Sequence, residues 1–131
     1  MNNSNPNQSK VVMKTLSIAV PVYNEESNIP LLWAEILRLK EELSQRYNLE
    51  VVITDNHSTD NSEHLLTSMA LEYEFLKYIR FSRNFGYQHS ILEAFRHCSG
   101  DAAVQLDCDL QDPPSIILDF LREWELSLIH I

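Results

Sequence analysis

The sequence predicts an α/β fold: three α/β/α layers around a mainly parallel sheet. Strand-like and helix-like segments alternate along the chain, which is typical of parallel strands joined by crossover helices. The first strand-like run, residues 16–22, is almost entirely apolar, as expected of a strand covered on both faces. With 131 residues the chain has room for one such domain.

The predicted elements follow from the spacing of apolar residues. After the first strand, five large apolar residues recur at helical spacing: Ile29, Leu32, Trp33, Ile36 and Leu43. A capping-box pattern at residues 60–63 opens a second helix that ends near residue 71. The other predicted elements are strands at residues 51–54, 76–81 and 102–106, a helix at residues 87–98 closed by Gly100, and a helix at residues 115–124.

Polar residues follow each predicted strand. In the common doubly wound order the first strand is central, with the second on one side and the fourth on the other. Ligands then bind at the carboxyl ends of the strands, at the switch between the first and fourth strands. The segments expected at this edge are residues 23–26, 55–58, 82–86 and 107–112, and three of the four contain carboxylates.

The acidic segment after the fourth strand is the strongest chemical signal. Alternate residues of an extended chain share a face, so we expect Asp107, Asp109 and Gln111 to point the same way. Their oxygens are ligands that Mg²⁺ and Mn²⁺ prefer, and such ions often complete their shell with substrate phosphates. The alternative is a solvated turn in which Asp112 caps the next helix and Pro113 begins it.

Composition excludes several classes of function. The net charge of −9 argues against a nucleic-acid surface, and no apolar run is long enough for a membrane span. The two glycines, Gly86 and Gly100, exclude a G-x-G-x-x-G loop and a P-loop. Two cysteines do not form a disulfide framework and favour a reduced, cytoplasmic chain. The polar, Asn-rich residues 1–14 are predicted to be a disordered tail.

Four segments together resemble the family 2 glycosyltransferases, which have the GT-A fold. They read Val-Pro-Val-Tyr-Asn-Glu-Glu from residue 20, Asp-Asn-His-Ser-Thr-Asp from residue 55, Ser-Arg-Asn-Phe-Gly from residue 82 and Asp-Cys-Asp-Leu-Gln-Asp-Pro-Pro from residue 107. The nearest resemblance is to transferases that use polyprenyl-phosphate or dolichyl-phosphate. It covers about residues 16–121 and implies a Rossmann-like nucleotide-binding domain at residues 15–124, incomplete at its C-terminus.

The resemblance also implies roles for individual residues. Those implied to bind the nucleotide of the donor are Pro21, Tyr23, Glu25, Asp55, Arg83, Asn84 and Asp107. Asp109 and Gln111 are implied to bind Mg²⁺ or Mn²⁺, and Asp55 to hydrogen-bond the base. Asn56 stands where many members carry a second Asp, and His57 where a small residue is frequent, which leaves the identity of the base open.

The implied activity is inverting, metal-dependent transfer of a sugar from a UDP- or GDP-sugar to an acceptor, which for this branch is a polyprenyl phosphate. Members of the family continue well past this point with an acceptor half and a general base, so we expect both beyond residue 131. Residues 125–131 themselves do not look like a family continuation. These residues alone are then expected to be inactive and prone to form a homo-oligomer, and the full-length protein to act at the cytoplasmic face of a membrane.

Two alternatives remain open. The first is a non-catalytic nucleotide- or metal-binding module with the same fold. The second is a phospho-acceptor signalling domain, which needs an Asp at the end of its third strand. The chain has Arg80-Phe81-Ser82-Arg83 there, which argues against it.

Overall fold

The computed structural model describes residues 13–111 and 115–129. Its strands β1 (Lys14–Val22), β2 (Tyr47–Asp55), β3 (Leu76–Arg80) and β4 (Ala102–Gln105) form one parallel sheet in the order β3-β2-β1-β4. The helices are α1 (Ile29–Leu43), α2 (Ser62–Glu72), α3 (Tyr87–Arg96) and α4 (Ser115–Ile129). The predicted alternation and the central first strand are confirmed. Residues 1–12, most of the predicted tail, and the predicted cap at Asp112 and Pro113 lie outside the described residues.

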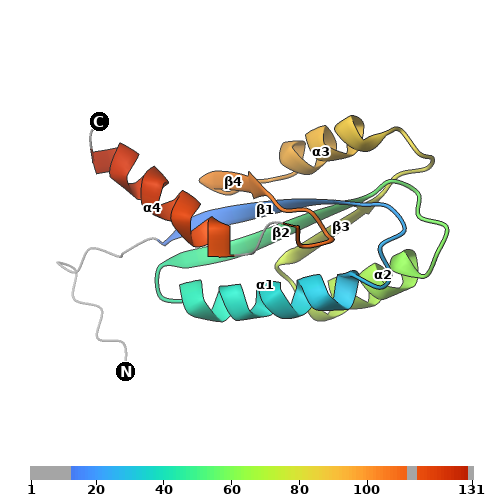
Figure 1. Ribbon diagram of the computed structural model, residues 1–131, viewed down its shortest axis with the longest axis horizontal. Helices are drawn as coiled ribbons and strands as arrows, with labels where there is room; N and C mark the ends of the chain where they lie inside the picture. Colours follow the sequence, from blue (N-terminus) through green and yellow to red (C-terminus); the bar gives the residue numbers. More distant parts are fainter. Residues whose placement is uncertain (1–12, 112–114, 130–131) are drawn as a thin grey trace, which may run out of the picture.

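The two faces of the sheet carry cores of different size. Figure 1 shows α1 and α2 on one face and α3 on the other. On the first face, Leu16, Ile18 and Val20 of β1 are fully buried in a large cluster that also includes Ile117 and Leu121 of α4. On the α3 face the buried cluster consists of Ala19, Val52 and Ala94. Because successive side chains of a strand point to opposite faces, β1 supplies both clusters.

Strand β2 begins at Tyr47, earlier than the predicted residue 51. Sequence reasoning stopped at Glu50, a charged residue that is only 9% exposed. Its carboxylate accepts hydrogen bonds from the hydroxyls of Ser17 (2.6 Å) and Ser99 (2.7 Å) and pairs with Lys77 Nζ at 2.7 Å. Burial opposes ionisation, but these bonds outweigh it and lower the pKa of Glu50 to about 2. Partners distant in sequence therefore allow a charged residue inside this strand.

Two other predicted boundaries were wrong. Helix α4 continues past Trp124 to Ile129. Gly100 does not close α3, which ends at Arg96. A Cβ at position 100 would lie 2.5 Å from Ser17 Oγ and 2.8 Å from the Thr15 carbonyl oxygen. Gly100 is therefore needed for a close approach to β1, and its N–H donates to Ser17 Oγ at 2.9 Å.

Candidate functional site

A cavity of about 390 Å³ lies at the carboxyl ends of β1 and β2, beside the start of α3. This is the predicted edge of the sheet, but the strand order switches between β1 and β4, and the lining includes no residue of β4 or of residues 106–111. Four of the predicted site residues line it, namely Pro21, Tyr23, Glu25 and Asn84. The other lining residues are Val22, Asn56, Gly86, Tyr87 and Ser90.

The cavity combines aromatic walls with amide groups. Tyr23 and Tyr87 are 46% and 55% exposed, so their rings are available to a ligand. Asn56 Nδ2 donates to Asn84 Oδ1 (2.7 Å), and Asn56 Oδ1 accepts from the N–H of Phe85 (2.8 Å). These bonds tie the loop after β2 to the loop after β3. Aromatic faces beside fixed polar groups suit a planar heterocycle with polar edges.

Helix α3 forms one wall of the cavity and sits close to the sheet. Gly86 precedes it with a φ of +94°, a conformation that glycine adopts without strain. The Thr54 hydroxyl of β2 donates to the Ser90 carbonyl oxygen of α3 at 2.9 Å. The small residues Ala19, Val52 and Ala94 between helix and sheet make this approach possible.

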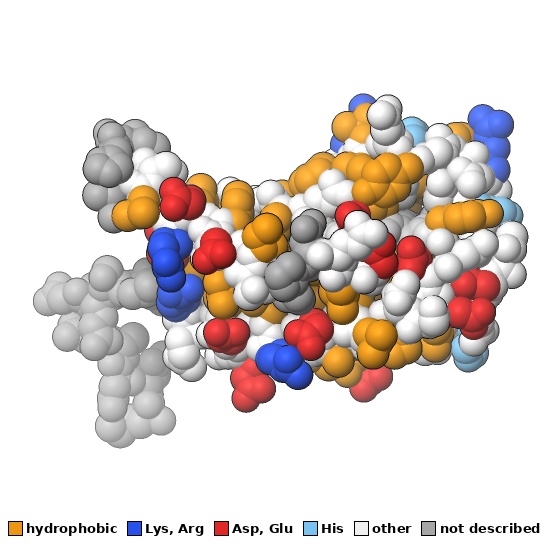
Figure 2. Space-filling model, in the orientation of Figure 1, with side chains coloured by type: hydrophobic (Ala, Val, Ile, Leu, Met, Phe, Trp, Pro, Cys, Tyr) orange, Lys and Arg blue, Asp and Glu red, His pale blue; other side chains and the backbone are white. Residues whose placement is uncertain are grey.

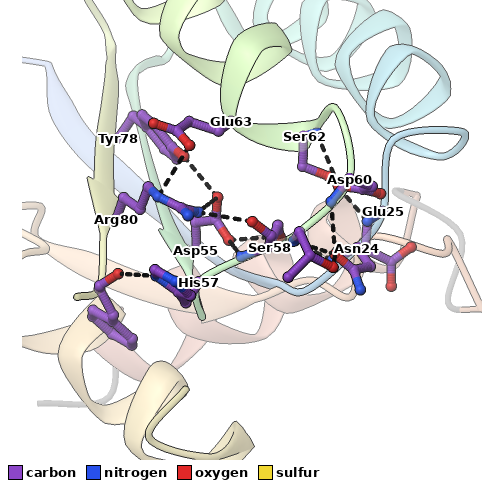
Figure 3. Close-up of polar contacts among 12 residues, drawn as sticks. Asn24, Glu25, Asp55, His57, Ser58, Asp60, Ser62, Glu63, Tyr78 and Arg80 are labelled. Carbon is purple, nitrogen blue, oxygen red and sulfur yellow. Dashed lines mark hydrogen bonds and ion pairs between the residues drawn. The ribbon is translucent and has the colours of Figure 1, made fainter. Parts of the chain in front are cut away.

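Asp55, the predicted base contact, lies outside the lining of the cavity and is 0% exposed. Its Oδ1 accepts from the N–H (2.8 Å) and the hydroxyl (2.6 Å) of Ser58. Its Oδ2 accepts from the Tyr78 hydroxyl (2.6 Å) and from Arg80 (3.4 Å), which also pairs with Glu63 at 3.2 Å. Figure 3 shows these side chains converging on Asp55. Burial, and then the bond to Asp55, raises the pKa of Tyr78.

The loop after β1 is joined to the segment between β2 and the start of α2 by hydrogen bonds from three consecutive backbone N–H groups, of which Asn24 and Glu25 are labelled in Figure 3. The bonds are Asn24 N to Ser58 Oγ (2.9 Å), Glu25 N to Ser62 Oγ (3.1 Å) and Glu26 N to Asp60 Oδ2 (3.2 Å). Asn24 Oδ1 in turn accepts from the N–H groups of Thr59 (2.7 Å) and Asp60 (3.2 Å). We refer to residues 23–26 and 55–62 together as the loop clamp.

The acidic segment is a turn, so the expectation of an extended chain was wrong. Strand β4 ends at Gln105, Leu110 has a φ of +56°, and its N–H donates to the Asp107 carbonyl oxygen at 3.2 Å. Asp107 Oδ1 accepts from the Tyr87 hydroxyl at 2.9 Å, which places it next to the cavity. Burial, and then this bond, raises the pKa of Tyr87. We refer to residues 106–111 as the acidic turn.

Asp109 and Gln111 are both exposed, and the Gln111 N–H donates to Asp109 Oδ1 at 3.3 Å. Within residues 13–111 and 115–129 there is no group of three or more His, Cys, Asp or Glu side chains that could hold an ion alone. The exposed oxygens fit Mg²⁺ or Mn²⁺ if a phosphate supplies further ligands. Cys108, between Asp107 and Asp109, is 2% exposed, and burial raises its pKa to about 12, so it is a core residue.

Arg83 does not line the cavity. It is exposed, and its guanidinium lies 4.5 Å from the centre of the Phe85 ring. Figure 2 shows acidic side chains distributed across the viewed face of the molecule.

Sequence reasoning missed Asn56, Tyr87 and Ser90 as lining residues. Asn56 directly follows β2, so its position at the strand end was a usable signal. Tyr87 and Ser90 lie in the first turn of α3, and the sequence does not show which side of that helix faces the loops.

A parallel sheet with an aromatic, amide-lined cavity at the carboxyl ends of its strands, near an acidic turn, defines an α/β domain with a candidate ligand site at that edge. Residues 17–127 match the family described as Glycosyl transferase family 2, and the chain belongs to this family. The chain is 32% identical over 110 residues to a bactoprenol glucosyl transferase of Shigella phage SfV, covering 84% of this chain and 35% of that protein. It is 39% identical over 106 residues to an undecaprenyl-phosphate 4-deoxy-4-formamido-L-arabinose transferase of Yersinia enterocolitica, covering 80% of this chain and 32% of that protein.

Solved structures share the fold. A mannosyltransferase from Pyrobaculum calidifontis, solved with GDP-Man and Mn²⁺, matches with a TM-score of 0.63 and 24% identity over 79% of this chain and 34% of that one. TarS of S. aureus, solved with UDP, matches with a TM-score of 0.60 and 25% identity over 72% and 27% of the two chains. The predicted GT-A fold is confirmed. The chain spans about a third of the length of the curated relatives it matches. Among the described residues, no helix has the length and apolar character needed to cross a bilayer.

Proposed function

We propose that this chain forms the donor-nucleotide site of a glycosyltransferase that moves a sugar from a UDP- or GDP-sugar to a polyprenyl phosphate, with inversion. The observation that carries the proposal is the cavity at the carboxyl ends of β1 and β2, which contains Tyr23, Glu25 and Asn84. Family membership and the named substrates of two relatives support the substrate classes.

In this proposal the base lies against Tyr23 or Tyr87 and the amides of Asn56 and Asn84 contact its polar edge. The diphosphate then extends toward the acidic turn, because Asp107 is bonded to Tyr87 at the cavity wall. Arg83 directly precedes Asn84, which lines the cavity, so its guanidinium could form a charged contact with the phosphates of the donor. Asp55 supports the cavity from outside its lining.

The metal is Mg²⁺ or Mn²⁺, held by Asp109 and Gln111, with Asp107 close to it or to the ribose. When bound, such an ion stabilises the charge that develops on a leaving diphosphate. The two exposed oxygen donors are too few to bind it strongly, so the metal and the nucleotide should bind together.

A lipid-phosphate acceptor is anionic at neutral pH, so its attack needs little help from a general base. We therefore assign no general base among the described residues. An acceptor carried by a lipid would place the reaction at the cytoplasmic face of a membrane.

Calorimetry tests the donor site. We expect UDP or GDP to bind measurably in the presence of Mn²⁺, ADP to bind more weakly, and removal of the metal with EDTA to lower the affinity for UDP or GDP at least about tenfold, or ~1.4 kcal/mol. Asp109→Ala should have the same effect as EDTA. Asp119→Ala, which removes an exposed carboxylate on α4, is the matched control and should change nothing.

Unchanged metal-dependent binding in Asp109→Ala would contradict the metal assignment, and equal affinity for ADP would contradict the base site. Nucleotide binding without sugar transfer by the full-length protein would instead favour a non-catalytic nucleotide-binding module.

A further inference from the structure

We propose that Asp55 is a positioning residue for the cavity and does not contact the nucleotide. Through Ser58 it fixes the backbone turn at Asn24, and that turn directs Tyr23 and Glu25 into the cavity. The identity of the ligand rests on the proposed function, but the role of Asp55 in positioning Tyr23 and Glu25 does not depend on it.

The first step is the environment of the Asp55 carboxylate. It is fully buried, and each of its oxygens already accepts two hydrogen bonds. A buried carboxylate is tolerated only when it is paired in this way. A base could reach Asp55 only if Tyr78 or Arg80 gave up its bond, whereas Asn56, the next residue, already lines the cavity.

The second step is the orientation of the Ser58 hydroxyl. A hydroxyl has one hydrogen to donate and lone pairs to accept with. Ser58 donates its hydrogen to Asp55 Oδ1 at 2.6 Å, which leaves its oxygen to accept from the Asn24 N–H at 2.9 Å. Asp55 therefore determines which way this hydroxyl faces the loop after β1.

The third step is the turn at Asn24. Its φ of +51° is a left-handed conformation, which asparagine adopts more readily than most residues with a side chain. The Ser58 bond holds its N–H, and its Oδ1 is held by the N–H groups of Thr59 and Asp60. Its neighbours Tyr23 and Glu25 both line the cavity. Loss of the Ser58 bond would leave the turn held only through Asn24 Oδ1 and the Glu25 N–H, and would therefore loosen the backbone that carries these two side chains.

Figure 3 shows the whole path, from Tyr78 and Arg80 on β3 through Asp55 and Ser58 to Asn24 and Glu25. It links three consecutive strand ends of the sheet, β3, β2 and β1. The β3 side chains, which do not line the cavity, thereby take part in shaping it.

The test is Ser58→Ala in the 131-residue chain, followed by NMR. We expect the Asn24 amide proton to lose the shift of a hydrogen-bonded group, and the amides of Asn24, Glu25 and Glu26 to exchange with solvent about tenfold faster, a change of ~1.4 kcal/mol. Amides at the far end of β2, such as Leu49, should keep their protection. Ser44→Ala is the matched control, since Ser44 donates its hydroxyl to a backbone carbonyl at the end of α1.

A double-mutant cycle with Asp55→Asn connects the two residues. Asp55→Asn keeps the shape of the side chain but points an NH₂ group at one pair of donors to Asp55. It should therefore speed the exchange of the same three amides, those of residues 24–26. Amide exchange at residues 24–26 in the double variant should be no faster than in the more affected single variant, because Asp55 acts on Asn24 through Ser58. Additive effects would overturn the proposal, as would normal exchange at residues 24–26 in both single variants.

Nucleotide affinity separates positioning from contact. Positioning predicts that Ser58→Ala and Asp55→Asn weaken UDP, GDP and ADP by a similar factor, about tenfold. A change in the ranking of the bases that is confined to Asp55→Asn would show direct contact and overturn the proposal. If the unaltered chain binds no nucleotide, the proposed function fails, and the exchange data still decide on the positioning.

Discussion

The loop clamp and the acidic turn lie at the same edge of the sheet but are held in different ways. In the loop clamp, the bonds from Asn24, Glu25 and Glu26 reach across 34 to 37 residues of sequence. In the acidic turn, the bonds of Asp109 and Leu110 are local, and Asp107 connects to the cavity through the Tyr87 hydroxyl. The loop clamp is therefore built into the fold, while the acidic turn, which adjoins the cavity through Tyr87, exposes its polar groups.

This difference matches what each side would have to do. A base is recognised by shape and by a few fixed polar groups, so a rigid pocket lowers the entropy lost on binding. A divalent ion that shares its ligands with a diphosphate needs exposed donors that can adjust. The comparison predicts that substitutions in the loop clamp change stability most, and those at the acidic turn least.

The largest effect is expected from Asp55→Ala. It removes the buried acceptor of the Ser58 and Tyr78 hydroxyls and leaves Arg80 with Glu63 as its remaining carboxylate, so the free energy of unfolding should fall by about 3–5 kcal/mol. Urea unfolding followed by circular dichroism measures this. Asp119→Ala is the exposed control, and a loss below about 1 kcal/mol in Asp55→Ala would remove the basis for calling the clamp rigid.

An intermediate effect is expected from Glu50→Gln, at the opposite end of the sheet. The folded pKa of Glu50 is about 2 against an ordinary 4.5. The ionised Glu50 carboxylate therefore contributes its full stabilisation of the folded state above about pH 4.5, and this contribution is lost as the pH falls toward 2. At pH 7 the variant should lose about 1.5–3 kcal/mol, and this difference should shrink across that acid range.

Unfolding curves from pH 7 to 2 test this, with Glu72→Gln as an exposed control. Exchange at residues 24–26 should be unchanged in Glu50→Gln, because Glu50 bonds to Ser17, Ser99 and Lys77 and to none of the loop clamp. Faster exchange there would mean that the amides of residues 24–26 exchange through global unfolding. Their protection would then say nothing about the loop clamp relative to the acidic turn.

The smallest effect is expected from Tyr87→Phe. It removes the hydroxyl that donates to Asp107 and accepts from Gln105, both at an exposed position. Thermal unfolding should show a loss below about 1 kcal/mol. Tyr23→Phe removes a hydroxyl from the same cavity and serves as control. A loss above about 2 kcal/mol would show that the acidic turn is held as firmly as the clamp.

Much of the fold could be predicted because it depends on local patterns. The apolar run of β1 and the helical spacing of Ile29, Leu32 and Trp33 do not need tertiary partners to be recognised. The start of β2 could not be predicted, because Glu50 is compatible with a strand only through Ser17, Lys77 and Ser99. Gly100 was misread as a helix end because its close neighbour, Ser17, is far away in sequence.

The site was predictable in position more than in detail. The resemblance to family 2 glycosyltransferases implied Pro21, Tyr23, Glu25 and Asn84, which all line the cavity, and the last three also follow predicted strands. The burial of Asp55 depends on Tyr78 and Arg80 of the neighbouring strand, and nothing close to it in sequence indicates them. The shared face of Asp107, Asp109 and Gln111 assumed an extended chain, and the positive φ of Leu110 breaks that alternation.

The small residues between α3 and the sheet set the width of the cavity. Tyr87 and Ser90 belong to a helix whose distance from the sheet is fixed by Ala19, Val52 and Ala94, and Ala94 itself does not line the cavity. Replacing Ala94 with Val would push α3 outward and move one wall of the cavity while leaving every lining residue unchanged, a shift that a crystal structure of the variant would measure. A methyl group that does not line the cavity thus helps to set how far the α3 wall of the cavity lies from the sheet.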